Sequence, residues 1–116
     1  MKGDLVEVSE IAACLWLVTV HGEHDLSNVS ELDDAIGGVF RAGSRVVVDL
    51  SEASFIDSSI LGSLLRGRQK ADGDVSHELV IVAPVGTSPR RLIDITGVAG
   101  CLPIFESREA ALDAFA

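Results

Sequence analysis

Hydroxyl and carboxylate side chains that could take part in chemistry gather in three short segments of the sequence. They lie in residues 22–27, 51–59 and 84–89, and the polar residues of interest there, one histidine included, are Glu23, His24, Asp25, Asp57, Ser58, Ser59, Thr87 and Ser88. A serine with a histidine and a carboxylate could form a hydrolytic triad. A serine hydroxyl alone could instead accept a phosphoryl group and become a charge switch. The surrounding sequence must decide between these two chemistries.

The motifs of the sequence do not support an enzyme. No GxSxG turn presents a nucleophilic serine, and His24 lies beside Asp25 in sequence rather than being oriented by a buried acid. No GxGxxG or Walker-type loop is present, and the histidines and cysteines lack metal-ligand spacing. A phospho-accepting receiver domain needs a lysine late in the chain, but the only lysines are Lys2 and Lys70. We therefore expect no enzyme activity, no cofactor and no metal.

The composition fits one folded, acidic domain. The chain has 116 residues, of which 47% are hydrophobic, so it can bury a sizeable core. Its net charge of −9 would repel phosphate backbones and anionic lipids, so we expect neither nucleic-acid nor membrane binding. The longest apolar run, residues 11–20, is too short to span a bilayer, and acidic residues near the start exclude a secretory signal. These features predict a cytoplasmic protein.

The sequence contains two cysteines, Cys14 and Cys101. Both are set among apolar residues, and neither has a cysteine close to it in sequence. Cysteines of cytoplasmic proteins are usually reduced. We therefore expect two buried thiols rather than a disulfide.

Apolar patterns predict strands that alternate with helices. Residues 14–21 and 45–50 are apolar on both faces, which is typical of strands in the middle of a helix-covered sheet. Further strands are predicted at residues 5–8, 78–83 and 102–105, and the segments 22–25 and 51–56 are predicted to be loops. Helices are expected after Asn28, which with Glu31 resembles a capping box, and from Ser58 to Gly73, with Asp57 or Ser58 as the N-cap. Two more helices are expected, one that ends at Gly97 with Ser88 as its cap before Pro89, and one after the cap Ser107.

This alternation predicts an α/β fold that forms a single domain over residues 1–116. We expect a mixed, mostly parallel sheet of about five strands, with an antiparallel first strand and about four helices. In such sheets the loops beyond the carboxyl ends of the strands meet at one end of the fold. The three segments that carry the polar residues are therefore predicted to lie at that end.

The stretch from Val46 to Gly62, VVVDLSEASFIDSSILG, resembles the signature of the STAS domain, as found in bacterial anti-sigma-factor antagonists. Two other segments agree with it. Residues 22–25, GEHD, are similar to the Gly-Glu-x-Asp loop of that family, and residues 88–97 are similar to its segment after the fourth strand. The resemblance covers nearly the whole chain from about Leu15 onward, in the right order and spacing.

The resemblance implies a protein that is switched by phosphorylation. Ser58 would be the phosphoacceptor, and the kinase would be the cognate anti-sigma factor, an ATP-dependent serine kinase. The unmodified form would bind that anti-sigma factor and free the sigma factor, and a phosphatase would reset the modified form. The partner-binding residues would be Glu23, Asp25, Asp57, Ser58, Ser59 and Ile60. The resemblance also leaves an alternative, a STAS adaptor in a signalling scaffold or a transporter-associated complex that is not switched at Ser58.

The start of the predicted helix suits such a switch. Backbone N–H groups that are free at a helix N-terminus could receive a phosphoryl group at Ser58. The added charge of about −1.5 to −2 would lie beside Asp57 and hinder a docked partner. The sequence departs from the family at Ile60, where glycine is usual. The Ile60 side chain is expected to pack inward, with exposure toward the partner as the alternative.

Overall fold

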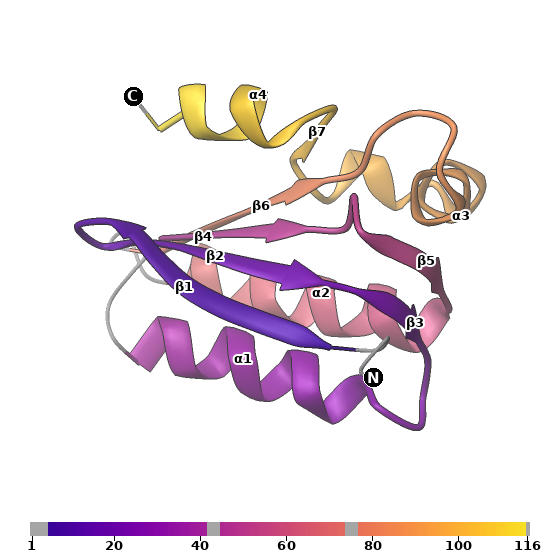
Figure 1. The fold of residues 1–116 in the computed structure, drawn as a ribbon, viewed down its shortest axis with the longest axis horizontal. Coiled ribbons are helices and arrows are strands. Elements are labelled where there is room, and N and C mark those ends of the chain that lie inside the picture. The colour runs from indigo at the N-terminus through magenta and orange to yellow at the C-terminus, as the bar shows by residue number, and fades with distance from the viewer. Residues whose placement is uncertain (1–4, 42–44, 74–76, 116) are drawn as a thin grey trace.

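A five-stranded sheet forms the centre of the computed structural model, which describes residues 5–41, 45–73 and 77–115 (Figure 1). Its strand order is β1 (Val6–Ala12), β2 (Leu15–Val20), β4 (Arg45–Asp49), β6 (Glu78–Val82) and β7 (Ile104–Phe105). Strand β1 pairs antiparallel with β2, and the other neighbours are parallel. The predicted mixed sheet with an antiparallel first strand is confirmed.

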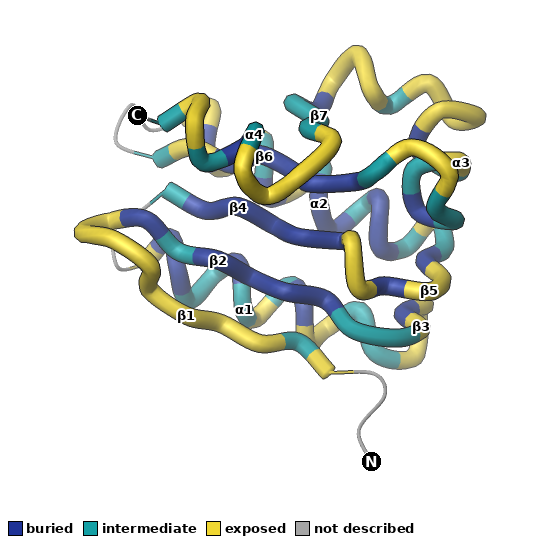
Figure 2. The backbone as a smooth tube through the Cα atoms, turned by 45° about the horizontal axis from the view of Figure 1, so that its top comes forward, coloured by how far each residue is buried: buried dark blue, intermediate teal, exposed yellow. Residues whose placement is uncertain are grey.

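The central strands are buried because helices cover both of their faces. Helices α1 (Val29–Arg41) and α2 (Ser58–Asp72) lie side by side on one face, and α4 (Arg108–Asp113) lies on the other. Val46, Val47 and Val48 of β4 have no exposed surface, and Figure 2 shows the same burial along β2 and β6. The β-branched run therefore occupies the middle layer, as its composition predicts.

Two segments that were predicted to be loops are short strands. Strand β3 (Gly22–His24) pairs in parallel with β5 (Ala53–Ile56), and together they form a second, two-stranded sheet. The burial of His24 and Ile56 anchors this ladder to the core. The pairing joins segments about thirty residues apart, and neither segment has enough residues to show a strand period of its own.

The helix boundaries agree with the predicted caps, with one shift. Gly73 follows α2, and Gly97 ends α3 (Ser88–Thr96) with a left-handed φ of 78° that suits glycine. The Ser107 hydroxyl caps α4 as predicted. The cap of α3 is Thr87, whose hydroxyl accepts from the Arg90 N–H, rather than Ser88, which is the first helical residue.

The cysteines were wrongly predicted to be buried. Cys14 and Cys101 are both exposed, and both are free thiols. Cys14 lies in the turn between β1 and β2 with a φ of 59°, one residue before the buried strand begins. Cys101 follows the short 3₁₀ helix Val98–Gly100, where the chain turns toward β7. Both thiols lie in surface turns although apolar residues flank them in sequence.

An ion pair holds α4 against the end of β4. The Asp49 carboxylate is completely buried, and its Oδ2 accepts hydrogen bonds from Nε and Nη2 of Arg108 at 2.9 and 2.6 Å. Its Oδ1 accepts from the Ser51 N–H at 2.9 Å. If the cation is removed, the buried carboxylate keeps an uncompensated charge. The free-energy cost of this charge is larger than the net stabilisation that the intact pair provides.

We expect Arg108→Ala to destabilise the domain by about 2 kcal/mol. Loss of the guanidinium leaves the buried Asp49 charge without its cation, but the guanidinium is half exposed, which limits the cost. Denaturant unfolding measures the change. Arg91→Ala is the matched control, because Arg91 is exposed and forms no ion pair with any described residue. Equal, small losses in the two variants would show that the Asp49–Arg108 pair does not hold α4 in place.

Candidate functional site

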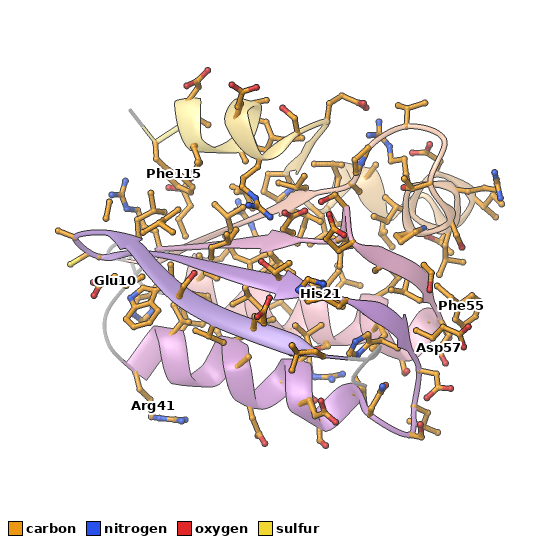
Figure 3. All side chains as sticks on the ribbon, viewed as in Figure 1. Glu10, His21, Arg41, Phe55, Asp57 and Phe115 are labelled. Carbon is orange, nitrogen blue, oxygen red and sulfur yellow. The ribbon has the colours of Figure 1, made fainter. Side chains whose placement is uncertain are left out.

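Two of the three polar segments meet at one end of the molecule. The β3–β5 ladder places Glu23 opposite Phe55, two residues before Asp57 and the start of α2. The third segment leads into α3, which packs against β5. Figure 3 shows Phe55 and Asp57 together at this end. The arrangement agrees with the prediction that the polar loops gather at the carboxyl ends of the strands.

Asp57 is the N-cap of α2. Its backbone is extended, and its Oδ1 accepts from the N–H groups of Ser59 and Ile60 at 3.0 and 3.4 Å. The same oxygen accepts from the Ser59 hydroxyl at 2.5 Å. Asp57 is therefore the N-cap of this helix, but its hydrogen bonds contradict another expectation. The N–H groups of Ser59 and Ile60, which were expected to be free for a phosphoryl group, already bind the Asp57 carboxylate.

The two adjacent serines differ in access. Ser58 is exposed, and its hydroxyl makes no hydrogen bond to any residue that the structure describes. Ser59 is half-buried, and its hydroxyl is engaged by Asp57. A kinase needs a hydroxyl that can enter its active site, so the first serine is the better acceptor of the pair.

Ile60 is completely buried in the main core cluster. Its side chain packs inward, as the favoured alternative predicts. Ile60 was also predicted to belong to the partner-binding surface. This prediction is wrong, because a side chain without exposed surface cannot contact a partner. The isoleucine at this position is therefore a core residue.

The loop after β3 is held by its own hydrogen bonds. Asp25 Oδ1 accepts from the backbone N–H and hydroxyl of Ser27 at 2.9 and 2.6 Å, and these bonds lower the pKa of Asp25. Asn28 Oδ1 accepts from the Asp25 N–H at 2.8 Å, and its Nδ2 donates to the Glu23 carbonyl at 3.2 Å. Asn28 thus fixes this loop, whereas the sequence predicted that it would cap α1 with Glu31. Glu23 and Asp25 remain exposed.

His24 does not complete a triad with Ser58. Its side chain is fully buried, and its Nε2 lies 2.9 Å from the His21 carbonyl. A buried imidazole of this kind anchors β3 and does not face solvent beside an exposed serine. Within the described residues, no group of three or more potential ligands could hold a metal ion.

Comparison with protein families identifies the fold. The family model of the STAS domain matches residues 6–111. The chain belongs to the STAS domain family. A search of curated proteins finds no match to this STAS domain. None of the helices in the described residues is both long and apolar enough to cross a membrane.

Solved structures with this fold include regulators and a transporter. An anti-sigma factor antagonist from Mycobacterium paratuberculosis is 29% identical, with a TM-score of 0.85 over 95% of this chain and 92% of that chain. The Bacillus cell fate determinant SpoIIAA in its phosphorylated form is 18% identical, with a TM-score of 0.71 over 97% and 100%. The murine anion transporter Slc26a9 is also 18% identical, with a TM-score of 0.68 over 90% of this chain and 18% of that chain. The last two likenesses concern the fold alone.

Two exposed apolar residues in the β3 and β5 segments of this STAS domain were not among the predicted site residues. Leu26, in the loop after β3, is 75% exposed, and Phe55 on β5 is 44% exposed. Both lie within the segments already singled out for their polar residues. The signal that could have found them is a large apolar side chain inside a polar functional loop, since such a residue has either a packing role or a docking role.

Proposed function

We propose that this STAS domain is an anti-sigma-factor antagonist that binds its anti-sigma factor through the surface around Ser58. The observation that carries the proposal is the exposed Ser58 hydroxyl, which no described residue binds, at the first position of a capped helix. The likeness to the Mycobacterium paratuberculosis protein, which is described as an anti-sigma factor antagonist, supports it. The domain acts as a regulated binding protein in the cytoplasm, and the ATP belongs to the partner, an anti-sigma factor with serine kinase activity.

The proposed docking surface combines acidic and apolar groups. Glu23 and Asp25 are exposed at the end of β3 and in the loop after it, which also exposes Leu26, and Phe55 adds apolar area beside Asp57. Apolar side chains that protrude among charged ones are typical anchors of protein interfaces. Ser59 supports this surface by its hydrogen bond to Asp57.

Phosphorylation acts on the interface rather than on the fold. The phosphoryl group adds a charge of about −1.5 to −2 at Ser58. The Asp57 carboxylate lies beside it and already occupies the nearby N–H groups, so the phosphate gains few new hydrogen bonds. A partner would have to desolvate two adjacent negative groups, which is unfavourable. The modified form therefore releases the anti-sigma factor until a phosphatase removes the group.

We expect Ser58→Ala to abolish phosphate incorporation, while Ser59→Ala keeps most of it. The measurement is incubation with ATP and an anti-sigma kinase from the same organism, beginning with any encoded beside its gene, followed by mass spectrometry of the modified peptide. Ser59→Ala is the matched control, because it removes a neighbouring hydroxyl that is engaged by Asp57. Phosphate found chiefly on Ser59 would contradict the assignment, and stable binding without phosphorylation would favour the adaptor function.

A further inference from the structure

A cleft lies between the last turns of α1 and α2, far from Ser58. It is an open cleft of about 410 Å³, and Gly37, Phe40, Arg41, Lys70 and His77 are among the residues that line it. A second hollow of about 250 Å³ shares Gly37 and Lys70 with it. Figure 3 shows Arg41 and Asp57 at opposite ends of the helical layer. The cleft is thus separate from the surface proposed to bind the anti-sigma factor, and its size suits a small molecule.

Two cations at this cleft, Arg41 and Lys70, form no ion pair within the described ranges 5–41, 45–73 and 77–115. Ion pairs or a ring contact engage most of the described arginines: Arg45, Arg66, Arg68, Arg90 and Arg108. The chain has 18 acidic residues against nine basic ones, so partners are plentiful elsewhere. Two cations that share one concave surface of an acidic protein, and that no described acid binds as an ion pair, point to an anionic ligand.

The acid that lines the second hollow together with Lys70 already has other partners. Asp33 Oδ1 accepts from the buried Ser63 hydroxyl at 2.5 Å and from Nη2 of Arg66 at 3.0 Å. Burial alone would raise the pKa of Asp33, but these hydrogen bonds and the positive charges of Arg66 and Lys70 outweigh it and lower the pKa. The hydrogen-bond and ion-pair partners of Asp33 are thus Ser63 and Arg66 of α2, and the Lys70 charge acts on it without a direct ion pair.

Gly37 leaves space in the cleft that packing does not require. A Cβ at Gly67 would lie 2.9 Å from Leu79 Cδ1, so that glycine is needed for the close approach of α2 to β6. A Cβ at Gly37 would meet only Nη1 of Arg41, at 3.5 Å, which is ordinary contact with a flexible group. Glycine weakens a helix, and no close contact with the described residues requires one at position 37. A ligand that lies across the helix at Gly37 does explain it.

A pair of stacked rings forms an apolar wall of the cleft. The rings of Phe40 and His77 have centroids 4.9 Å apart and an interplanar angle of 16°. We propose that the cleft binds a small organic anion, whose planar apolar part lies against this wall and over Gly37. Its phosphate or carboxylate would lie between Arg41 and Lys70, which supply a guanidinium fork and an ammonium.

Positive residues in the last turn of a helix also offset the helix dipole. That effect would account for the places of Arg41 and Lys70 in sequence without any ligand. It does not account for the glycine or for the cavity, and it predicts that removing the charges changes only stability. A binding measurement therefore separates the two explanations.

The test is a titration of the full chain with phenyl phosphate, followed by backbone amide shifts. We expect saturable shifts at Gly37, Gly73 and His77, with a dissociation constant of about 1 mM, as suits a ligand of this size. Inorganic phosphate should bind at least about fivefold more weakly, because it cannot use the apolar wall. Shifts that do not saturate, that centre on Ser58, or that are equal for the two probes would overturn the proposal.

Variants make the test specific. Arg41→Gln and Lys70→Gln should each weaken phenyl phosphate binding at least about fivefold, while Arg91→Gln, an unpaired arginine on α3, should leave it unchanged. Gly37→Leu should abolish binding by filling the cleft, with a melting temperature that is unchanged or raised. Equal affinity in Gly37→Leu and the wild type would place the ligand elsewhere. Equal losses in Arg41→Gln and Arg91→Gln would show that only net charge matters.

Discussion

Ser58→Asp should bind the anti-sigma factor at least about tenfold more weakly than the wild type, which corresponds to about 1.4 kcal/mol. The substitution adds one negative charge beside Asp57 on an exposed position of the proposed interface. Docking would require both carboxylates to lose their water. Among the described residues, no cation forms an ion pair with Asp57 that could offset this loss. Affinity should be measured by calorimetry with the purified anti-sigma factor.

The melting temperature of Ser58→Asp should hardly change. Ser58 is the first residue of α2, its hydroxyl makes no hydrogen bond to the described residues, and an acid at a helix start interacts favourably with the dipole. Ser107→Asp is the matched control, because it adds the same charge at the start of α4, on the other face of the sheet. Its affinity should equal that of the wild type. If Ser58→Asp binds as tightly as the wild type, Ser58 is not a switch, and the adaptor function becomes the better explanation.

The elements that surround Ser58 could be predicted from the sequence because each carries a strong local signal. The run Val46–Val48 has the composition of a buried strand, and the aspartate before Ser58 is a preferred N-cap residue. The structure confirms both. The buried position of Ile60 also followed from the apolar face that it shares with Leu61 and Leu64.

The errors arose where geometry decides between residues of similar type. Thr87 and Ser88 are both good caps before Pro89, and only the backbone shows which one lies outside the helix. Cys14 was predicted to lie in the buried strand, but that strand begins at Leu15, and Cys14 belongs to the turn before it. The β3–β5 ladder depends on pairing between distant segments, which no local pattern reports.

The cleft between α1 and α2 could not be predicted from the sequence for the same reason. Lys70 is exposed on α2, and within this helix alone it is an ordinary residue of a solvated face. Its neighbour across the cleft, Arg41, is 29 residues earlier in the chain, and the parallel packing of two helices brings them to one cavity. A binding site of this kind is a property of the packed helices and not of either sequence segment.

Ile60→Gly should destabilise the domain by about 3–5 kcal/mol, the largest stability loss among the substitutions considered. Removing a fully buried isoleucine side chain leaves a cavity in the main core, which costs about 2–5 kcal/mol. The glycine adds roughly 0.5–1 kcal/mol by weakening the first turn of α2. Such a loss is a large part of the stability of a domain this size, so unfolding should be followed by denaturant at low temperature.

Ile95→Gly separates the two contributions to this loss. Ile95 lies in α3 and is 75% exposed, so the same substitution there should cost only the helix-propensity difference of roughly 0.5–1 kcal/mol. The folded fraction of Ile60→Gly should keep its affinity for the anti-sigma factor, because the isoleucine has no exposed surface to contribute. A variant that keeps its stability but loses its partner would place Ile60 on the docking surface after all. The family position that usually holds glycine would then act in recognition, and the inward packing of α2 would have to be revised.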